Sequence, residues 1–282
     1  MARCDLHMHT VYSDGKLSVA DLIELVNYYE IEAISITDHD TLKSQREGLS
    51  LANENGIEYI TGVEVSTILE GKEIHILGYG IDTEDSNLNH LFEKIRKDRV
   101  QRTISILEKL RNYGIFIDIK EFGSDFMDLN IGRPHIARKM LEKGWINNYD
   151  EAFQKYLYNN GPCYVPKMDV HPKVAIEHIH DAGGIAVLAH PGLMLNEKDI
   201  EGVIDSGVDG LEIYYPKHTE AQKHRFIEIA RSNNLLETGG SDFHGREKDY
   251  KIMREHIVPY EIFEKLRRVY DQRKLNEKIE YR

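Results

Sequence analysis

The chain has 282 residues, with 41% hydrophobic and 30% charged residues and a formal net charge of −12 at pH 7. This length allows one large α/β domain or a domain that carries an insertion. The acidic balance argues against broad DNA or RNA binding, because sequence-independent binding of nucleic acid depends on cationic surface. The two cysteines, Cys4 and Cys163, fit a reducing compartment better than a disulfide scaffold.

We expect neither a signal peptide nor a membrane-spanning segment. Charged residues and histidines occur within the first nine residues, where a signal peptide would have an apolar core. No apolar run approaches the roughly 20 residues needed to cross a bilayer. We therefore expect a cytoplasmic protein that has no membrane partner.

Strand and helix patterns alternate over the first 81 residues. The first strand ends in His7-x-His9, and a period of two places both histidines on the same face. Ser18 is suited to cap the helix that follows, and Gly71 supplies a turn between two later strands. The pattern predicts strands at residues 3–9, 33–40, 58–66 and 73–81, and helices after residue 18 and from 44 to 55.

The alternation is interrupted between about residues 86 and 158, where the pattern is helical. This segment is too long for a simple loop between strand and helix, so we assign residues 86–159 to a small helical insertion, or cap domain. Residues 1–85 and 160–282 form the main domain. In its second part we expect helices at 172–182, 197–205, 219–233 and 260–269, strands at 184–191, 209–215 and 235–238, and a solvated charged tail.

Strands that alternate with helices are typical of parallel sheets, and about seven such strands favour a barrel over an open sheet. The sequence therefore predicts an α/β fold of the barrel type. Chemistry in such barrels collects at the C-terminal ends of the strands. Polar residues cluster at the ends of several expected strands, among them Asp38 with His39, and Asp242 with His244.

These strand ends supply enough side chains to bind several metal ions. Nine nitrogen and oxygen ligands are too many for one ion and suit two or three. Imidazole mixed with carboxylate, without thiolate, favours Mn, Zn or Fe over Ca. Ions that share a carboxylate can convert a bridging water to a hydroxide near neutral pH, and we expect this hydroxide to be the nucleophile. The candidate ligands are His7, His9, Asp14, His39, Glu64, His75, His190, Asp242 and His244.

The same residues form a series of motifs that resembles the PHP (polymerase and histidinol phosphatase) superfamily over nearly the whole chain. The motifs are His7-x-His9, Ser13-Asp14-Gly15, Thr37-Asp38-His39-Asp40, Gly62-x-Glu64, His75-x-x-Gly78, Ala189-His190-Pro191 and Gly240-Ser241-Asp242-Phe243-His244. The resemblance implies a distorted (β/α)7 barrel with three metal ions. It places His7, His9, Glu64 and Asp242 on the first ion, Glu64, His75 and His190 on the second, and Asp14, His39 and His244 on the third. Asp38 would orient a histidine.

Further features resemble the branch of nucleoside 3′,5′-bisphosphate phosphatases and RNase AM-like 5′-to-3′ exoribonucleases. They include Asp14, the helical insertion, Arg133-x-His135 and His218 after a strand. The resemblance implies that Arg133, His135 and His218 bind substrate phosphate, with Lys167 as a further candidate. The catalytic residues that we infer are Asp14, Glu64, Asp242 and His218.

We therefore expect a metal-dependent phosphoesterase that acts on a nucleotide or on a short RNA with a 5′ phosphate. One alternative is a phosphatase of histidinol phosphate or of another small phosphomonoester. A different alternative is a metal-binding regulatory module without catalysis, which the complete ligand set disfavours. Glu212, at the end of a strand near the expected cleft, could form a salt bridge or take part in catalysis.

Overall fold

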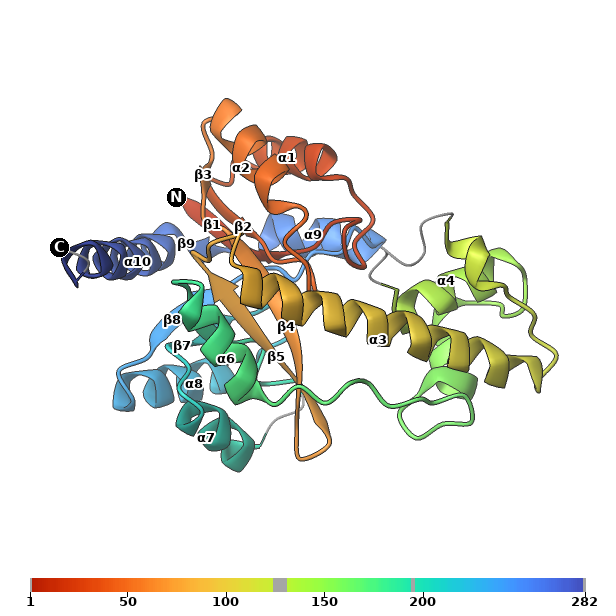
Figure 1. Cartoon of the computed structure of the whole chain (residues 1–282). Helices are drawn as coiled ribbons and strands as arrows, with labels where there is room; N and C mark the ends of the chain where they lie inside the picture. Colours follow the sequence, from red (N-terminus) through yellow and green to blue (C-terminus); the bar gives the residue numbers. More distant parts are fainter. Residues whose placement is uncertain (1, 124–130, 194–195, 281–282) are drawn as a thin grey trace. The chain divides into compact units, whose positions relative to one another are not determined.

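The computed structural model describes residues 2–123, 131–193 and 196–280, and it divides into two compact units (Figure 1). The first, which we call the α/β unit, comprises residues 1–89 and 170–282. The second, the helical unit, comprises residues 90–169. No helix among the described residues is both long enough and apolar enough to span a membrane.

One sheet of the α/β unit is built around the first strand. Strands β1, β2 and β3 are parallel, and β9 pairs with β1 in the antiparallel direction. Helix α1 begins where the sequence predicts, because the Ser18 side chain accepts a hydrogen bond from the Asp21 amide at 3.1 Å. The elements are β1 (Arg3–Met8), α1 (Val19–Tyr28), β2 (Ala33–Ile36), α2 (Gln45–Glu54), β3 (Glu58–Tyr59) and β9 (Val258–Pro259), with strand order β3-β2-β1-β9.

The second sheet corrects the expectation of parallel strands, because β5 runs antiparallel to both of its neighbours. Only Glu70 and Gly71 lie between β4 and β5, and both have a positive φ, 49° and 77°. A two-residue turn of this kind builds a hairpin, whereas a parallel connection needs a dozen or more residues. The strands are β4 (Gly62–Leu69), β5 (Lys72–Tyr79), β6 (Ile185–Leu188), β7 (Gly210–Tyr214) and β8 (Leu236–Gly239), in that order in the sheet.

Two isolated parallel bridges link the sheets of the α/β unit. One pairs Met8 with Phe243, and the other pairs His39 with Glu64. The second bridge brings the end of β2 against β4, and the Asp40 amide donates a hydrogen bond to the Glu64 carbonyl at 3.0 Å. Residues far apart in the sequence are thereby held at one edge of the two sheets.

The C-terminal part of this unit contains more helix than the sequence predicts. The expectation that the last helix ends near residue 269 is wrong, because α10 continues to residue 280. Charged residues with high helix propensity sustain it, including an Arg267–Asp271 pair one turn apart. Helix α9 was not expected, because its polar sequence buries little apart from Met253 and Asp249. The helices are α6 (Pro172–Asp181), α7 (Glu197–Asp205), α8 (Glu220–Ser232), α9 (Glu247–Glu255) and α10 (Tyr260–Glu280).

The helical unit has an apolar core of its own, which includes Leu110, Ile136 and Met140. Its return segment, residues 163–169, is tied to the long helix α3 by two hydrogen bonds. Arg102 Nε donates to the Val165 carbonyl at 2.7 Å, and the Met168 amide donates to Asp98 at 2.9 Å. The elements are α3 (Ser86–Arg111), which begins in the α/β unit, η1 (Ile119–Phe122), α4 (Arg133–Glu142), α5 (Tyr149–Ala152) and the π-helical turn η3 (Phe153–Leu157).

Asp209 connects three elements of the α/β unit. Its carboxylate accepts hydrogen bonds from His180 Nε2 and the Ala186 amide, both at 2.8 Å, and forms an ion pair with Arg273 of α10. Burial by itself would raise the pKa of Asp209, but His180 and Arg273 outweigh burial and lower it. The ionised carboxylate therefore stabilises the folded state.

We expect Asp209→Asn to lower the free energy of unfolding by about 1.5–3 kcal/mol at neutral pH, as is typical for hydrogen bonds to charged groups. The pKa of Asp209 is lower in the folded than in the unfolded chain, so this stabilisation exists above the unfolded pKa. It is lost as the pH falls through the folded pKa. Urea denaturation of both proteins over a pH series measures the effect, with the exposed Asp205→Asn as the control. A difference that persists unchanged in acid would contradict it.

Candidate metal centre

The first strand directs two imidazoles to the same place. His7 in β1 and His9, just after the strand ends at Met8, are fully buried, with ring centroids 5.2 Å apart. Leu6 precedes His7 and Met8 follows it, and the two are buried in separate apolar clusters. Alternation along the strand therefore separates the polar face from the apolar core.

Glu64 on β4 lies at the centre of this polar cluster. Its Oε2 atom is 3.2 Å from His7 Nε2, His9 Nε2 and His39 Nδ1. Its Oε1 atom is 2.8 Å from His75 Nδ1 and 2.9 Å from His190 Nε2. One carboxylate that is 1% exposed thus faces five imidazoles from four strands or strand ends.

The remaining expected ligands lie beside this carboxylate. Asp242 Oδ1 is 3.4 Å from His9 Nε2 and 3.5 Å from His244 Nδ1. The other oxygen of Asp242 accepts a hydrogen bond from the Tyr215 hydroxyl at 2.9 Å. His244 Nε2 is 3.1 Å from Asp14 Oδ1. The structure therefore gathers all nine expected ligands in the α/β unit.

Four groups of these side chains have ligand atoms close enough to share a metal ion. The resemblance places His75 and His190 on one ion, but here they fall in different groups. Both groups contain Glu64, whose Oε1 atom contacts both rings. The groups are His9, Asp14, His39 and His244; His7, Glu64 and His190; His7, His9 and Asp242; and His39, Glu64 and His75.

Buried polar atoms test whether these residues fit a metal. His7 Nε2, His9 Nε2 and Glu64 Oε2 are buried and form no hydrogen bond of acceptable geometry. This holds although Glu64 Oε2 lies 3.2 Å from each of the two imidazole nitrogens. Burying such atoms is costly unless something satisfies them. A divalent cation between imidazole nitrogens and a carboxylate oxygen would satisfy all three, so the donor set fits a transition metal.

The charge state of the cluster also suits metal ions. Burial would raise the pKa of Glu64, but the surrounding imidazoles, His39 foremost, hold it well below its ordinary value. Burial lowers the pKa of His39 to about 3, so its ring is neutral. Burial by itself would lower the pKa of His7. The carboxylates of Glu212 and Glu64 outweigh burial, and the pKa of His7 lies well above its ordinary value. Metal binding would therefore displace protons from part of the cluster.

Hydrogen bonds at the second ring nitrogen orient three of the histidines. His7 Nδ1 lies 2.8 Å from Glu212 Oε1, and His75 Nε2 lies 3.0 Å from Glu73 Oε1. His244 Nδ1 donates to the carbonyl of Asp242 at 2.8 Å. Such partners fix the tautomer and the ring plane of a metal-binding histidine. They leave the opposite nitrogen of each ring directed at a carboxylate of the cluster.

Glu212 on β7 is the main residue whose role the sequence left open. It is fully buried, its Oε1 atom bonds His7, and its Oε2 atom accepts the His190 amide at 2.7 Å. One side chain therefore positions a ring and a backbone segment of the cluster. The signal in the sequence is an acidic residue within the otherwise apolar strand Gly210–Tyr214.

The described bonds of Asp38 differ from the expectation that it orients a histidine. Its carboxylate accepts from the Thr10 amide at 2.8 Å, the Thr10 hydroxyl at 2.7 Å and the Ser13 hydroxyl at 2.6 Å. Ser13 in turn lies 3.5 Å from His9 Nδ1. Asp38 therefore orders the loop that carries Asp14, and it reaches a histidine only through Ser13.

Two expected ligands have unusual backbone conformations. His190 and Asp242 have φ values of 30° and 56°, in the left-handed region that residues other than glycine rarely adopt. Such strain persists where neighbouring contacts fix the backbone. The Asp242 amide donates to the His7 carbonyl at 2.9 Å, which supplies one such contact.

His218, an expected phosphate-binding residue, is buried and bonded to the main chain at both ring nitrogens. Its Nδ1 atom bonds the Ile213 carbonyl at 3.0 Å, and its Nε2 atom accepts the Gly192 amide at 3.1 Å. Gln222 Nε2 donates to the Gly192 carbonyl at 3.1 Å. In this arrangement His218 and Gln222 fix the segment that follows His190.

The other expected phosphate-binding residues, Arg133, His135 and Lys167, lie in the helical unit. Arg133 begins α4, and its Nη1 atom donates to the Leu157 carbonyl at 2.9 Å and to Asn159 Oδ1 at 2.7 Å. His135 Nδ1 accepts the Gly132 amide at 3.1 Å and so caps the helix. Lys167 is half-buried in the return segment.

Comparison with known proteins assigns the family. The profile of the PHP domain matches residues 5–169, which is more than half of the chain. The chain belongs to the PHP domain family. This confirms the resemblance seen in the motifs, and PHP membership together with the relatives below makes the protein a metal-dependent phosphoester hydrolase.

Relatives of this PHP protein include a 5′-3′ exoribonuclease of Haemophilus influenzae, 34% identical over 85% of this chain and 89% of the relative. A 3′,5′-nucleoside bisphosphate phosphatase of Chromobacterium violaceum is 32% identical over 86% of this chain and 88% of the relative. A solved structure from Bifidobacterium adolescentis, described as a metal-dependent phosphoesterase, superposes with a TM-score of 0.85 and 27% identity over 94% of this chain and 95% of that one.

The central position of Glu64 leads to a prediction about metal content. We expect the purified PHP protein to carry two to three transition-metal ions, because one ion cannot engage nine ligands. Glu64→Gln should lower the content by more than one ion, whereas Asp14→Asn should lower it by at most one. Mass spectrometry of metal per chain decides this, and one ion or none at full activity would contradict the expectation.

The position of Glu212 leads to a second prediction. Glu212→Gln keeps the shape of the side chain but removes the charge beside His7, so we expect metal affinity to fall about 10–100-fold. Titration with a fluorescent chelator measures the change. Glu237→Gln, on the neighbouring strand β8, is the matched control, since Glu237 bonds Tyr214 outside the cluster. Equal affinities of the two variants would show that Glu212 does not tune the centre.

Proposed function

We propose that this PHP protein removes phosphate from nucleotides, with a 3′,5′-nucleoside bisphosphate or a short RNA with a 5′ phosphate as substrate. The observation that carries the proposal is the buried cluster of imidazoles and carboxylates around Glu64. The substrates named for the two relatives, RNA and nucleoside bisphosphate, support the nucleotide class.

We propose that two to three divalent ions, Mn, Zn or Fe, occupy the cluster through the nine expected ligands. When bound, such ions activate water as a nucleophile and neutralise charge on phosphoryl oxygens. The chain itself supplies orientation. Tyr215 holds the Asp242 carboxylate by a hydrogen bond, and Glu212 holds the ring of His7. Asp14, Glu64 and Asp242 are ionised, because the pKa of each lies well below its ordinary value.

We propose Arg133, His135 and Lys167 as the residues that bind substrate phosphate outside the cluster. Arg133 and His135 lie within the segment 86–159 that we regard as an inserted domain, and Lys167 follows it in the sequence. Two hydrogen bonds that Nη1 donates restrain the guanidinium of Arg133. A restrained guanidinium binds phosphate with two parallel bonds and loses little side-chain entropy. For His218 we propose a positioning role through Gly192, because main-chain groups occupy both of its ring nitrogens.

We further infer that the strands of the α/β unit close into the distorted barrel that the motif series implies. The inference is supported by the isolated bridges Met8–Phe243 and His39–Glu64, which lie where the two sheets meet. Closure would place the C-terminal ends of β1, β2 and β6 around one centre, as in other barrels of alternating strands and helices.

Arg133→Lys tests the choice of substrate. Lysine cannot reproduce the guanidinium fork, so we expect intact metal content and a roughly ten- to hundredfold lower kcat/KM. The loss should be larger for 3′-phosphoadenosine 5′-phosphate than for AMP or p-nitrophenyl phosphate, because the bisphosphate offers a second phosphate. Phosphate release from the three substrates measures it, and Arg231→Lys on α8 is the control for the same exchange. An equal loss on all three would remove the preference for the bisphosphate and leave a general phosphatase.

A further inference from the structure

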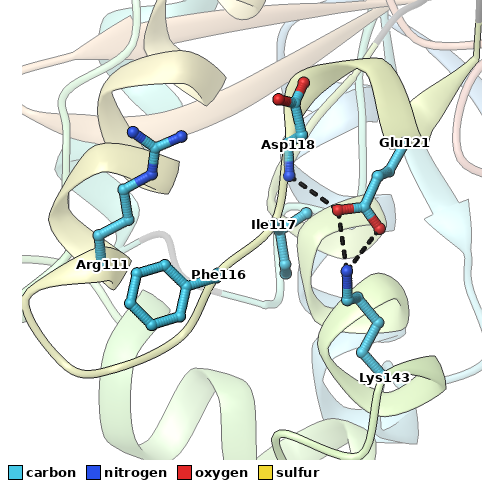
Figure 2. A pocket seen from close by; sticks show the side chains of 6 residues that line it. All are labelled: Arg111, Phe116, Ile117, Asp118, Glu121 and Lys143. Atoms are coloured by element: carbon cyan, nitrogen blue, oxygen red, sulfur yellow. Dashed lines mark hydrogen bonds and ion pairs between the residues drawn. The ribbon is translucent and has the colours of Figure 1, made fainter.

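The helical unit contains a pocket of about 490 Å³ that does not include any of the expected ligands. Figure 2 shows Arg111 and Phe116 on one side of it and an ion pair between Glu121 and Lys143 on the other. The volume lies within the range of small-ligand sites. The lining residues are Arg111, Phe116, Ile117, Asp118, Glu121 and Lys143.

Two large aromatic rings are exposed at this place. Phe116 is 58% exposed although its neighbours Ile115 and Ile117 are each 3% exposed, because alternation in an extended segment points Phe116 outward. Trp145 is 40% exposed, and its ring centroid lies 6.4 Å from that of Phe116. A bond from the Trp145 amide to the Met140 carbonyl fixes the turn that presents it. Both rings are therefore held outward by local backbone structure.

The polar groups of the pocket are of two kinds. Lys143 and Glu121 satisfy one another through bonds of 2.9 and 2.7 Å, and the Asp118 amide donates to Glu121 at 2.9 Å. The guanidinium of Arg111 makes no hydrogen bond or ion pair with another described residue, and it lies at the edge of the pocket (Figure 2). The ion pair of Glu121 and Lys143 therefore lies across the pocket from Arg111, whose guanidinium is available to an anionic group.

Charge is distributed unevenly along the chain. Residues 90–169 hold 14 of the 36 Lys and Arg residues but only 11 of the 48 Asp and Glu residues. The helical unit is therefore net positive, although the whole chain has a net charge of −12. A cationic unit with exposed aromatic rings suits single-stranded nucleic acid, which offers phosphates and flat bases at regular spacing. An apolar protein partner would leave Arg111 without a counterion.

We propose that this pocket is an accessory site that stacks one base of a single-stranded RNA on Phe116, with the tilted ring of Trp145 beside that base, while Arg111 binds an adjacent phosphate. The proposal rests on the proposed action on RNA, and it extends that action beyond the nucleotide whose bond is broken. The site would strengthen the binding of longer RNA and would leave the hydrolysis of mononucleotides unchanged.

Trp145 reports directly on binding, because it is the only tryptophan of the chain. The experiment adds a phosphorothioate-linked oligoadenylate, which resists hydrolysis, to the metal-loaded full-length protein and follows tryptophan emission. We expect quenching by the oligoadenylate and none by inorganic polyphosphate, which has charge but no bases. Phe116→Leu should weaken binding roughly five- to hundredfold, the range for one stacked base. Arg111→Gln should weaken it roughly ten- to hundredfold, the range for one charge-assisted contact.

The salt dependence separates the two contributions. Arg111→Gln should reduce the slope of log affinity against log salt by about 0.7, the value for one phosphate contact on a single strand. Phe116→Leu should leave the slope unchanged. The matched controls are Tyr28→Leu, which removes an exposed ring from the α/β unit, and Arg231→Gln, which removes an exposed charge there. Neither control should change the affinity.

Turnover distinguishes failure of this site from failure of the proposed function. If wild type hydrolyses neither 3′-phosphoadenosine 5′-phosphate nor RNA, the proposed function is wrong whatever the binding result. If it hydrolyses both, Phe116→Leu should raise KM for RNA and leave the bisphosphate unaffected. Unchanged oligoadenylate affinity in both variants would overturn the accessory site. A changed oligomeric state of Phe116→Leu in size-exclusion chromatography, with RNA binding intact, would show instead that the rings contact protein.

Discussion

The structure of the α/β unit depends on one buried carboxylate. Glu64 is 1% exposed, and a charge at such a position is costly unless it is paired. Five imidazoles lie within 3.2 Å of it and together lower its pKa, and they come from segments spread between residues 7 and 190. The same residue forms the backbone bridge to His39 that links the two sheets. Glu64 therefore links the two sheets through its backbone and gathers the imidazoles around its side chain.

A second set of acidic residues orients the ligands around Glu64 by hydrogen bonds. Glu212 and Glu73 bond the outer nitrogens of His7 and His75, while Asp38 orders the loop before Asp14. These three carboxylates thus hold ligands or ligand-bearing loops in place. Some acidic residues of the α/β unit therefore lie in the buried ligand cluster and not on the surface. Once cations are bound there, the formal net charge overstates the negative charge that a substrate encounters.

The two units of this PHP protein differ in their physical character. The α/β unit concentrates carboxylates and buried histidines, whereas the helical unit is net positive and exposes aromatic rings. A phosphoester hydrolase needs both properties, because metal ligands must be anionic or neutral and substrate phosphates favour cations. Placing them in separate units lets each surface keep the sign of charge that its ligand requires.

The sequence alone determined the features that depend on local order. Alternation placed His7 and His9 together, Ser18 marked the start of α1, and the ordered motifs identified the family. The tertiary structure decided what depends on neighbours distant in sequence, such as the antiparallel direction of β5 and the pairing of Glu212 with His7. Local periodicity fixes which face a side chain takes, but only folding brings two separate strands together. The sequence could therefore nominate ligands, and only the fold could assign each one its partner.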